Sequence, residues 1–287
     1  MIYSKIIAGT MTWGKWGKQL SKMAMIDLMH HCLAQGITSF DHADIYGGYT
    51  TEAAFGDAFK DSNIKRENIQ LITKCGIQYI SENRENTVKH YDYRKDYIIW
   101  SVDNSLRYLN TDYIDLLLLH RPSPLMNPEE IAEAISILKS SGKIRDFGVS
   151  NFTTSQMALL SKHQIIDVNQ IQFSLSDHQA MHDGVLDNMM IHNIKPMAWS
   201  PLGSIFKTNT EKEQRIHTEL DRLCLKYNAT KDQLLLAWIL KHPSGIIPVI
   251  GTTNKERIVD ASKVDEIHLE LEDWFKLLVA SQGHKVP

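Results

Sequence analysis

Short apolar runs rich in Leu, Ile and Val alternate along the chain with longer segments whose apolar residues recur every three to four positions. The short runs have the length of buried strands, and the longer segments have the period of amphipathic helices. This alternation predicts parallel strands joined by crossover helices. Eight strands are predicted, at Lys5–Ala8, Thr38–Asp41, Ile69–Thr73, Tyr113–Leu119, Asp146–Val149, Asp167–Ile171, Lys195–Ala198 and Ile246–Val249.

Helices are predicted at Met23–Gln35, Glu52–Lys60, Lys95–Leu109, Pro128–Ser141, Ser155–Lys162, Gly184–Asn193 and Glu211–Lys241, the last broken at "YNAT", with a further helix from Lys255. Eight strands that alternate with helices favour an α/β fold of the (β/α)8 TIM barrel type. An open doubly wound sheet is the alternative, and it is disfavoured because no G-x-G-x-x-G follows the first strand. With no internal repeat or linker, residues 1–287 are expected to form a single domain.

Two polar segments are longer than ordinary loops, Gln78–Arg94 and Pro201–Gln214. Both follow the carboxyl ends of predicted strands. In a barrel, loops at these ends overhang the catalytic face, so these two segments are expected to shape or cover a pocket.

The composition limits which binding partners and which cellular compartment are expected for the protein. With 31 basic and 34 acidic residues the formal charge is −3, which argues against nucleic acid or an anionic membrane as a partner. The three cysteines form no C-x-x-C pair, the N-terminus lacks a signal-peptide pattern, and no apolar run approaches the roughly 20 residues that span a bilayer. These features predict a cytoplasmic protein. The thirteen histidines lack zinc-site spacing, so no metal is predicted, and the sequence does not indicate an oligomeric state.

Polar side chains stand at the carboxyl ends of successive predicted strands, the edge at which barrel enzymes build their active sites. Taken singly, each has an ordinary explanation such as a turn or a helix cap. Their recurrence on consecutive strand ends is what indicates a site. The set comprises Asp41, Lys74, His120, Ser150, Asn151, Gln170, Trp199 and Ser200.

Segments between Gly9 and Ala261 resemble those of the aldo-keto reductase family in the same order. They are "DHADIYGG", "ITKCG", "LLLLHRP", "GKIRDFGVSNF", "VNQIQFS", "MAWSPLG" and "IPVIGTTNKERI". Within that family, "DHADIYGGY", "HRPSPLM" and the C-terminal "KVP" are most similar to the bacterial YdhF-type oxidoreductases. The resemblance implies an NADPH-dependent oxidoreductase that reduces a small-molecule aldehyde or ketone to an alcohol by direct hydride transfer.

The resemblance implies a catalytic tetrad of Asp41, Tyr46, Lys74 and His120. Tyr46 would give a proton to the carbonyl oxygen. A phenol with an ordinary pKa near 10 is a weak acid at neutral pH, so the Lys74 ammonium would assist it, and Asp41 would keep that lysine charged. His120 would donate a hydrogen bond to the substrate oxygen.

Three neighbouring residues receive structural interpretations, and a fourth is a conceivable alternative to Tyr46. His42 and Asp44 are interpreted as local hydrogen-bonding residues, and Cys75 as inert packing. Tyr49 is a conceivable substitute proton donor, but it lies three residues outside the spacing of the family.

The resemblance also implies the contacts to NADPH or NADP+. Ser150, Asn151 and Gln170 would bind the nicotinamide carboxamide, because their groups suit an amide, and Trp199 would stack on the ring. Further cofactor contacts are implied for the pyrophosphate, the 2′-phosphate and the ring, at Gly9, Thr10, Met11, Asp41, Ser200, Pro201, Leu202, Gly203, Gly251, Thr252, Thr253, Lys255 and Arg257. Arg257 and Lys255 are the candidates for the 2′-phosphate. Ala261 stands where many relatives carry a polar residue toward the adenine.

The substrate pocket is expected to include Trp13, Trp16 and Tyr79. Two rival functions stay open from the sequence. One is a non-catalytic NADP(H)-binding barrel that acts as a sensor or regulatory subunit. The other is a metal-dependent barrel hydrolase built on Asp41, His42 and His120, which would need more ligands at strand ends than the sequence supplies.

Overall fold

Eight parallel strands close into a barrel in the computed structural model, which describes residues 3–287. The barrel strands are β1 (Ile7–Gly9), β2 (Ser39–Asp41), β3 (Gln70–Cys75), β6 (Ile114–Leu119), β7 (Ile144–Ser150), β8 (Val168–Gln172), β9 (Lys195–Trp199) and β10 (Ile247–Ile250). Each pairs with the next along the chain, and β10 pairs with β1 through Val249 and Ile7. This closure confirms the predicted (β/α)8 barrel and contradicts the open-sheet alternative. The first two residues of the predicted domain lie outside the described residues.

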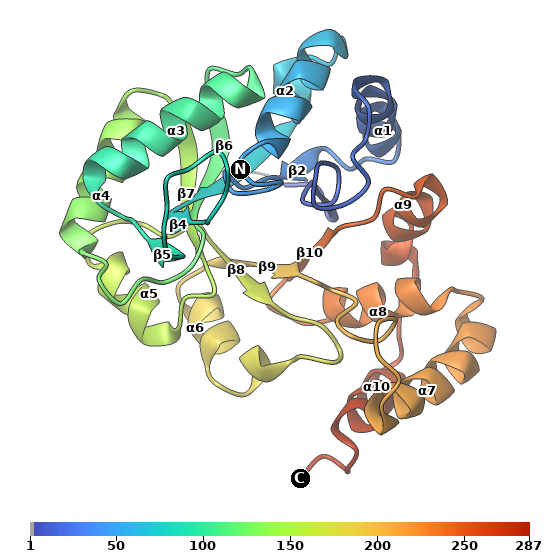
Figure 1. Cartoon of the computed structure of the whole chain (residues 1–287). Helices are drawn as coiled ribbons and strands as arrows, with labels where there is room; N and C mark the ends of the chain where they lie inside the picture. The colour runs from blue at the N-terminus through green and yellow to red at the C-terminus, as the bar shows by residue number, and fades with distance from the viewer. Residues whose placement is uncertain (1–2) are drawn as a thin grey trace.

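Helices form a ring around the strands (Figure 1). They are α1 (Lys22–Ala34), α2 (Thr51–Asp61), α3 (Lys95–Leu109), α4 (Pro128–Ser140), α5 (Thr154–Ser161), α6 (Val185–Ile191), α7 (Glu211–Tyr227), α8 (Lys231–Leu240), α9 (Lys255–Ser262) and α10 (Leu271–Gln282). The predicted break at "YNAT" is present, because Asn228 is left-handed with φ 48° and Thr230 begins α8 with a capping box. Helix α10, which packs against α7, was not predicted.

The apolar runs of the strands are continuous because both faces of each strand are buried. All six residues of β6 are buried. Leu116 and Leu118 pack inside the barrel with Ile7 and Met197, whereas Leu117 belongs to the outer core between strands and helices. The alternation of side chains along each strand therefore builds two apolar layers, and polar groups are left for the strand ends.

The two long segments lie at the carboxyl ends of the strands, as predicted. The first contains a small antiparallel hairpin, β4 (Ile77–Gln78) with β5 (His90–Tyr91). Two-residue strands carry no readable period, which is why the sequence did not predict this hairpin. The second segment consists of turns until Thr210 caps α7.

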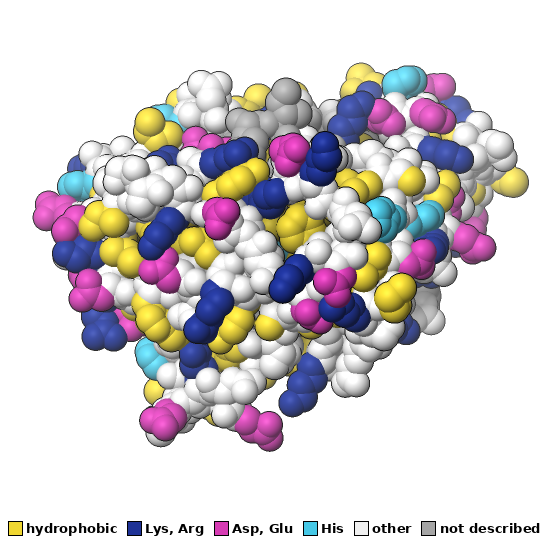
Figure 2. Space-filling model, turned by 90° about the horizontal axis from the view of Figure 1, so that it is seen from above, with side chains coloured by type: hydrophobic (Ala, Val, Ile, Leu, Met, Phe, Trp, Pro, Cys, Tyr) yellow, Lys and Arg dark blue, Asp and Glu magenta, His cyan; other side chains and the backbone are white. Residues whose placement is uncertain are grey.

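On the face of the molecule in Figure 2, Lys and Arg side chains are interspersed with Asp and Glu. Within residues 3–287, no helix has the length and apolar character to cross a membrane.

Candidate active site

Lys74, near the carboxyl end of β3, is the centre of a buried polar cluster. Its Nζ lies 2.7 Å from both Oδ1 and Oδ2 of Asp41, which ends the neighbouring strand β2. It also donates to the carbonyl oxygen of His42 at 2.7 Å and to the Tyr46 hydroxyl at 3.2 Å. The Lys74 side chain is 1% exposed and that of Asp41 is 4% exposed. Each charge is therefore stabilised by the other rather than by water.

The electrostatics of the cluster favour a charged lysine and a neutral phenol. Burial by itself lowers the pKa of Lys74, but Asp41 and Tyr46 outweigh burial and raise this pKa above its usual value. Burial raises the pKa of Tyr46, and Lys74 opposes the rise. Lys74 thus acts on the phenol in the expected direction, although burial has the larger effect because phenolate loses its hydration.

His120 follows β6 and faces the same site. Its backbone N–H donates to the carbonyl oxygen of Cys75 at 2.9 Å, which fixes it beside the end of β3. The centroids of the His120 and Tyr46 rings lie 6.1 Å apart, at an interplanar angle of 78°. Burial first, then Lys74, holds the pKa of His120 well below its usual value, so the ring is neutral and retains one N–H donor.

These groups open into a cleft of about 1040 Å³ at the carboxyl ends of the strands. The predicted site residues that line it are Gly9, Met11, Trp16, Asp41, Tyr46, Tyr79, His120, Ser150, Gln170, Trp199, Ser200, Pro201, Leu202, Gly203, Gly251, Thr252 and Arg257. Ala261 lines it as well.

Six predicted residues are absent from the walls of this cleft, although several support it. Lys74 lies behind Asp41, and Asn151 and Thr253 stand beside lining residues. Thr10 is fully buried, where its hydroxyl donates to the Asp41 carbonyl oxygen at 3.0 Å. The remaining two point elsewhere, because Trp13 packs edge-on against Phe40 in the core and Lys255 pairs with Asp27 of α1 at 2.6 Å.

Polar groups from three strands are connected by hydrogen bonds along the cleft, and Ser150 Oγ joins two of these strands by donating to the Gln170 carbonyl oxygen at 2.9 Å. Asn151 Nδ2 donates to Ser150 Oγ at 2.8 Å, and Trp199 Nε1 donates to Asn151 Oδ1 at 3.1 Å. Gln170 Nε2 donates to Asp41 Oδ1 at 3.0 Å, across the barrel from β8 to β2. This last contact joins the amide groups to the Lys74 cluster, and nothing in the sequence indicated it.

The cleft includes further residues that sequence reasoning missed. Arg121, Lys89 and Lys207 contribute cations, and Ile45 and Ile77 contribute apolar surface. Arg121 directly follows His120 in "LLLLHRP", so its place after a strand end was a usable signal. Lys89 and Ile77 belong to the region of the unpredicted hairpin.

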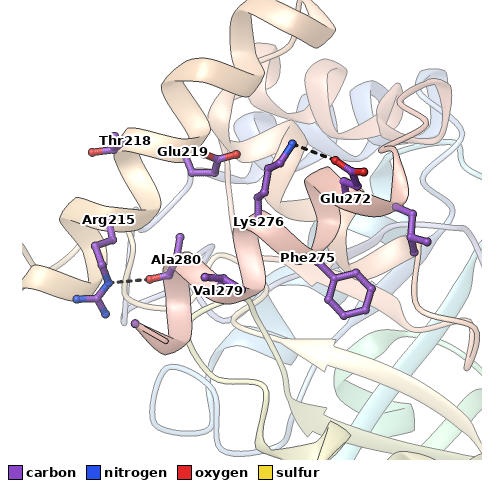
Figure 3. Close-up of a pocket in the computed structure, with 10 residues that line it drawn as sticks. Arg215, Thr218, Glu219, Glu272, Phe275, Lys276, Val279 and Ala280 are labelled. Carbon is purple, nitrogen blue, oxygen red and sulfur yellow. Dashed lines mark hydrogen bonds and ion pairs between the residues drawn. The ribbon is translucent and has the colours of Figure 1, made fainter. Parts of the chain in front are cut away.

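A second hollow, of about 740 Å³, lies between α7 and α10 (Figure 3). Exposed Leu271 and Phe275 border it, together with charged groups such as Arg215, whose Nε donates to the Ala280 carbonyl oxygen at 3.0 Å. It shares no lining residue with the strand-end cleft. The polar side chains predicted at the strand ends line the first cleft or lie next to it, and none lines the second hollow. The strand-end cleft is therefore the candidate active site.

The residues left over from "DHADIYGG" are buried beside the cluster. Thr10 Oγ1 lies 2.9 Å from His42 Nδ1, and burial, aided by Lys74, lowers the pKa of His42 to about 3. Burial raises the pKa of the Cys75 thiol well above its usual value, in keeping with a packing role. Across residues 3–287, no three His, Cys, Asp or Glu side chains are grouped to hold a metal ion.

Two carboxyl groups lie buried behind β3, those of Glu52 and Asp44. Glu52 accepts hydrogen bonds from Thr73 at 2.5 Å and from Ser105 at 3.0 Å. Burial raises the pKa of Glu52 to about 7, and burial followed by the charge of Glu52 raises the pKa of Asp44 well above its usual value. Burial thus shifts both acids toward the protonated form in the folded protein, Glu52 below a pH of about 7.

Glu52→Gln is expected to become more stable relative to the natural protein as pH rises from 5 to 8. The natural Glu52 binds its proton more tightly when folded, so its contribution is complete below the unfolded pKa of 4.5 and is lost as pH passes about 7. At about 1.4 kcal/mol for each pKa unit, the relative gain is up to about 3 kcal/mol. Urea unfolding at both pH values measures it. Exposed Glu67→Gln should show no such trend, and a flat difference for Glu52→Gln would contradict the buried-acid interpretation.

Comparisons with known proteins agree with this geometry. Residues 5–277 match the Aldo/keto reductase family. The chain is 43% identical to the oxidoreductase YcsN of Bacillus subtilis and 38% identical to the oxidoreductase YdhF of Escherichia coli, with 99% of this chain and 96% of each relative covered. An aldo/keto reductase from Klebsiella pneumoniae, solved in complex with NADP and acetate, superposes with a TM-score of 0.79 at 25% identity, over 96% of this chain and 90% of that one. The predicted resemblance to the family and to YdhF-type proteins is thereby confirmed.

Proposed function

Because the chain belongs to the Aldo/keto reductase family and is therefore an oxidoreductase, we propose that it reduces an aldehyde or ketone with NADPH, with Tyr46 as the acid. The observation that carries this proposal is the position of Lys74 Nζ. It bridges the Asp41 carboxylate, at 2.7 Å, and the Tyr46 hydroxyl, at 3.2 Å. These two partners line the cleft of about 1040 Å³, and Lys74 lies behind them.

The residues divide the work of carbonyl reduction among them. NADPH, when bound, would supply the hydride to the carbonyl carbon. Tyr46 transfers its proton to the carbonyl oxygen, which becomes the alcohol hydroxyl. Because burial raises the pKa of Tyr46, the phenol holds its proton at neutral pH, and Lys74 stabilises the phenolate left after transfer. His120, neutral and buried, donates a hydrogen bond that orients the oxygen.

The cleft fits a nicotinamide cofactor at two places. Ser150 and Gln170 offer hydroxyl and amide groups beside the face of Trp199, which suits a carboxamide on an aromatic ring. Farther along the cleft, Arg257 in the first turn of α9 and Lys207 supply cations for phosphate. We propose that these segments hold NADPH, as the Klebsiella pneumoniae enzyme holds NADP.

A turnover assay tests the proposal. The purified protein is mixed with NADPH and a panel of aldehydes and ketones, and the loss of NADPH absorbance is followed. Oxidation of NADPH that depends on a carbonyl compound supports the reductase. Tight NADPH binding without turnover on any member of the panel would favour the sensor or regulatory subunit instead. We also propose a cytoplasmic location, which the unpaired Cys32, Cys75 and Cys224 support.

Arg257→Ala is expected to weaken NADPH binding at least about tenfold and to leave NADH binding nearly unchanged. A charge-assisted bond to the 2′-phosphate contributes about 1.5–3 kcal/mol, and only NADPH carries that phosphate. Cofactor titration by protein fluorescence measures both affinities. Lys255→Ala is the comparison, and a smaller effect is expected because Lys255 pairs with Asp27 outside the cleft. Equal loss for both cofactors would assign Arg257 to the fold or the pyrophosphate.

A further inference from the structure

Arg121 is held by its main chain at the wall of the cleft. It follows β6 directly, next to His120. The hydroxyl of buried Tyr93 donates to the Arg121 carbonyl oxygen at 2.5 Å and accepts from the Arg121 N–H at 3.1 Å. The guanidinium carbon lies 5.2 Å from the centre of the Trp199 ring. The two hydrogen bonds to Tyr93 fix the Arg121 backbone, and the cation–π contact holds its guanidinium near Trp199 at the mouth of the barrel.

The guanidinium of Arg121 has no acidic partner in the part of the chain that the structure describes. Half-buried Arg66 shows the usual arrangement, since its Nη2 is 2.5 Å from Asp115 Oδ2. Arg121 is also half-buried, and burial lowers the pKa of its guanidinium, but neither an ion pair nor a side-chain hydrogen bond within residues 3–287 involves it. A partly dehydrated cation without an anion is costly, and a bound anion would remove that cost.

Arg121 follows His120 and lines the same cleft. The His120 ring lies near the Tyr46 ring, and Tyr46 and Tyr79 pack against Ile45 and Ile77. We call these five residues the substrate end of the cleft. Burial raises the pKa of Tyr46 and lowers that of His120, and the positive charge of Arg121 makes a smaller contribution that lowers both. Lys89 lines the same cleft and also lowers the pKa of His120. The carboxylate of Asp41 is already neutralised by Lys74. The substrate end therefore carries an excess of positive charge.

We infer that Arg121, assisted by Lys89, binds an acidic group of the substrate, so that the preferred substrate is an aldehyde or ketone that also bears a carboxylate or a phosphate. This inference rests on the proposed carbonyl reduction. The planar guanidinium suits both anions, because it presents paired N–H donors to two oxygens. Arg121 is distinct from the residues proposed to bind the cofactor phosphates. Those residues, Lys207 and Arg257, follow β9 and β10, whereas Arg121 follows β6.

Matched pairs of substrates test the inference. One pair is 4-carboxybenzaldehyde and its methyl ester, and the other is glyceraldehyde 3-phosphate and glyceraldehyde. We expect kcat/KM to be at least about tenfold higher for the acidic member of one pair, and that pair identifies the anion. Arg121→Met should remove the preference, so that kcat/KM falls at least about tenfold more for the acidic member than for the neutral member, chiefly through KM. Arg107→Met is the matched control, because the Arg107 guanidinium also lies over an aromatic ring, that of Tyr108, but outside the cleft.

Equal kcat/KM for both members of both pairs in the natural protein would overturn the inference. So would an equal loss for acidic and neutral substrates in Arg121→Met, or a loss of NADPH affinity in that variant. A binding measurement separates this inference from the proposed function. Calorimetric titration with 4-(hydroxymethyl)benzoate in the presence of NADPH needs no turnover, because neither the alcohol nor NADPH can accept a hydride from the other. Binding of 4-(hydroxymethyl)benzoate, or of glycerol 3-phosphate in the same titration, that weakens at least tenfold in Arg121→Met supports the anion site even if every aldehyde fails. Equal binding of both ligands to both proteins overturns it.

Discussion

Tyr46→Phe is expected to lower kcat for carbonyl reduction at least about a hundredfold and to leave NADPH affinity within a few fold. The substitution deletes the hydroxyl that lies 3.2 Å from Lys74 Nζ and keeps the ring that packs near His120. The proton for the carbonyl oxygen is lost, whereas the shape of the cleft is retained. Steady-state kinetics with saturating NADPH, together with fluorescence titration of the cofactor, measure the two effects.

Tyr49→Phe is the matched control for this prediction. The Tyr49 hydroxyl accepts from the Tyr79 N–H at 2.7 Å and supports the backbone of the hairpin segment. Its loss should alter KM modestly and leave kcat within a few fold. Retention of more than about a tenth of the natural turnover in Tyr46→Phe would show that Tyr46 is not the acid. A collapse of kcat in Tyr49→Phe instead would move the role of acid to Tyr49.

Lys74→Met is expected to reduce turnover as severely as Tyr46→Phe and, in addition, to destabilise the fold. The phenolate left by proton transfer would lose the adjacent Lys74 ammonium, and the buried Asp41 carboxylate would lose its counter-charge. Removal of one partner of a buried pair typically costs about 3–5 kcal/mol. Urea unfolding at pH 7 and steady-state kinetics measure the two losses independently.

The double variant Lys74→Met with Asp41→Asn separates stability from catalysis. With both charges removed, no uncompensated carboxylate is buried, so most of the lost stability should return. Gln170 retains a side-chain oxygen as its partner at position 41, since its Nε2 bonds the Asp41 Oδ1 that asparagine also provides. Turnover should stay as low as in Lys74→Met. Full activity in either variant would refute the role of the ion pair in proton transfer.

The elements of this fold could largely be predicted because their patterns are local. Strands such as β3 and β6 are buried along nearly their whole length, so their sequences are continuous apolar runs. Each helix buries one face, so its apolar residues recur with the helical period. Helix α10 follows the eighth strand, beyond the part of the pattern that indicates a barrel. The hairpin β4–β5 is too short to show a period, so its position over the cleft depends on contacts such as that between Tyr49 and Tyr79.

The sequence by itself determined the order of eight strands and placed Asp41, Lys74 and His120 at consecutive strand ends, because strand period and chain order are properties of neighbouring residues. Only the tertiary structure decided where side chains point once the barrel closes. Gln170 reaches Asp41 across 129 positions of sequence, and Lys255 turns to Asp27 instead of the cleft. Arg121 lies over the Trp199 ring and has no acidic partner among residues 3–287. Such contacts depend on register and closure, which bring together strands that no local pattern relates.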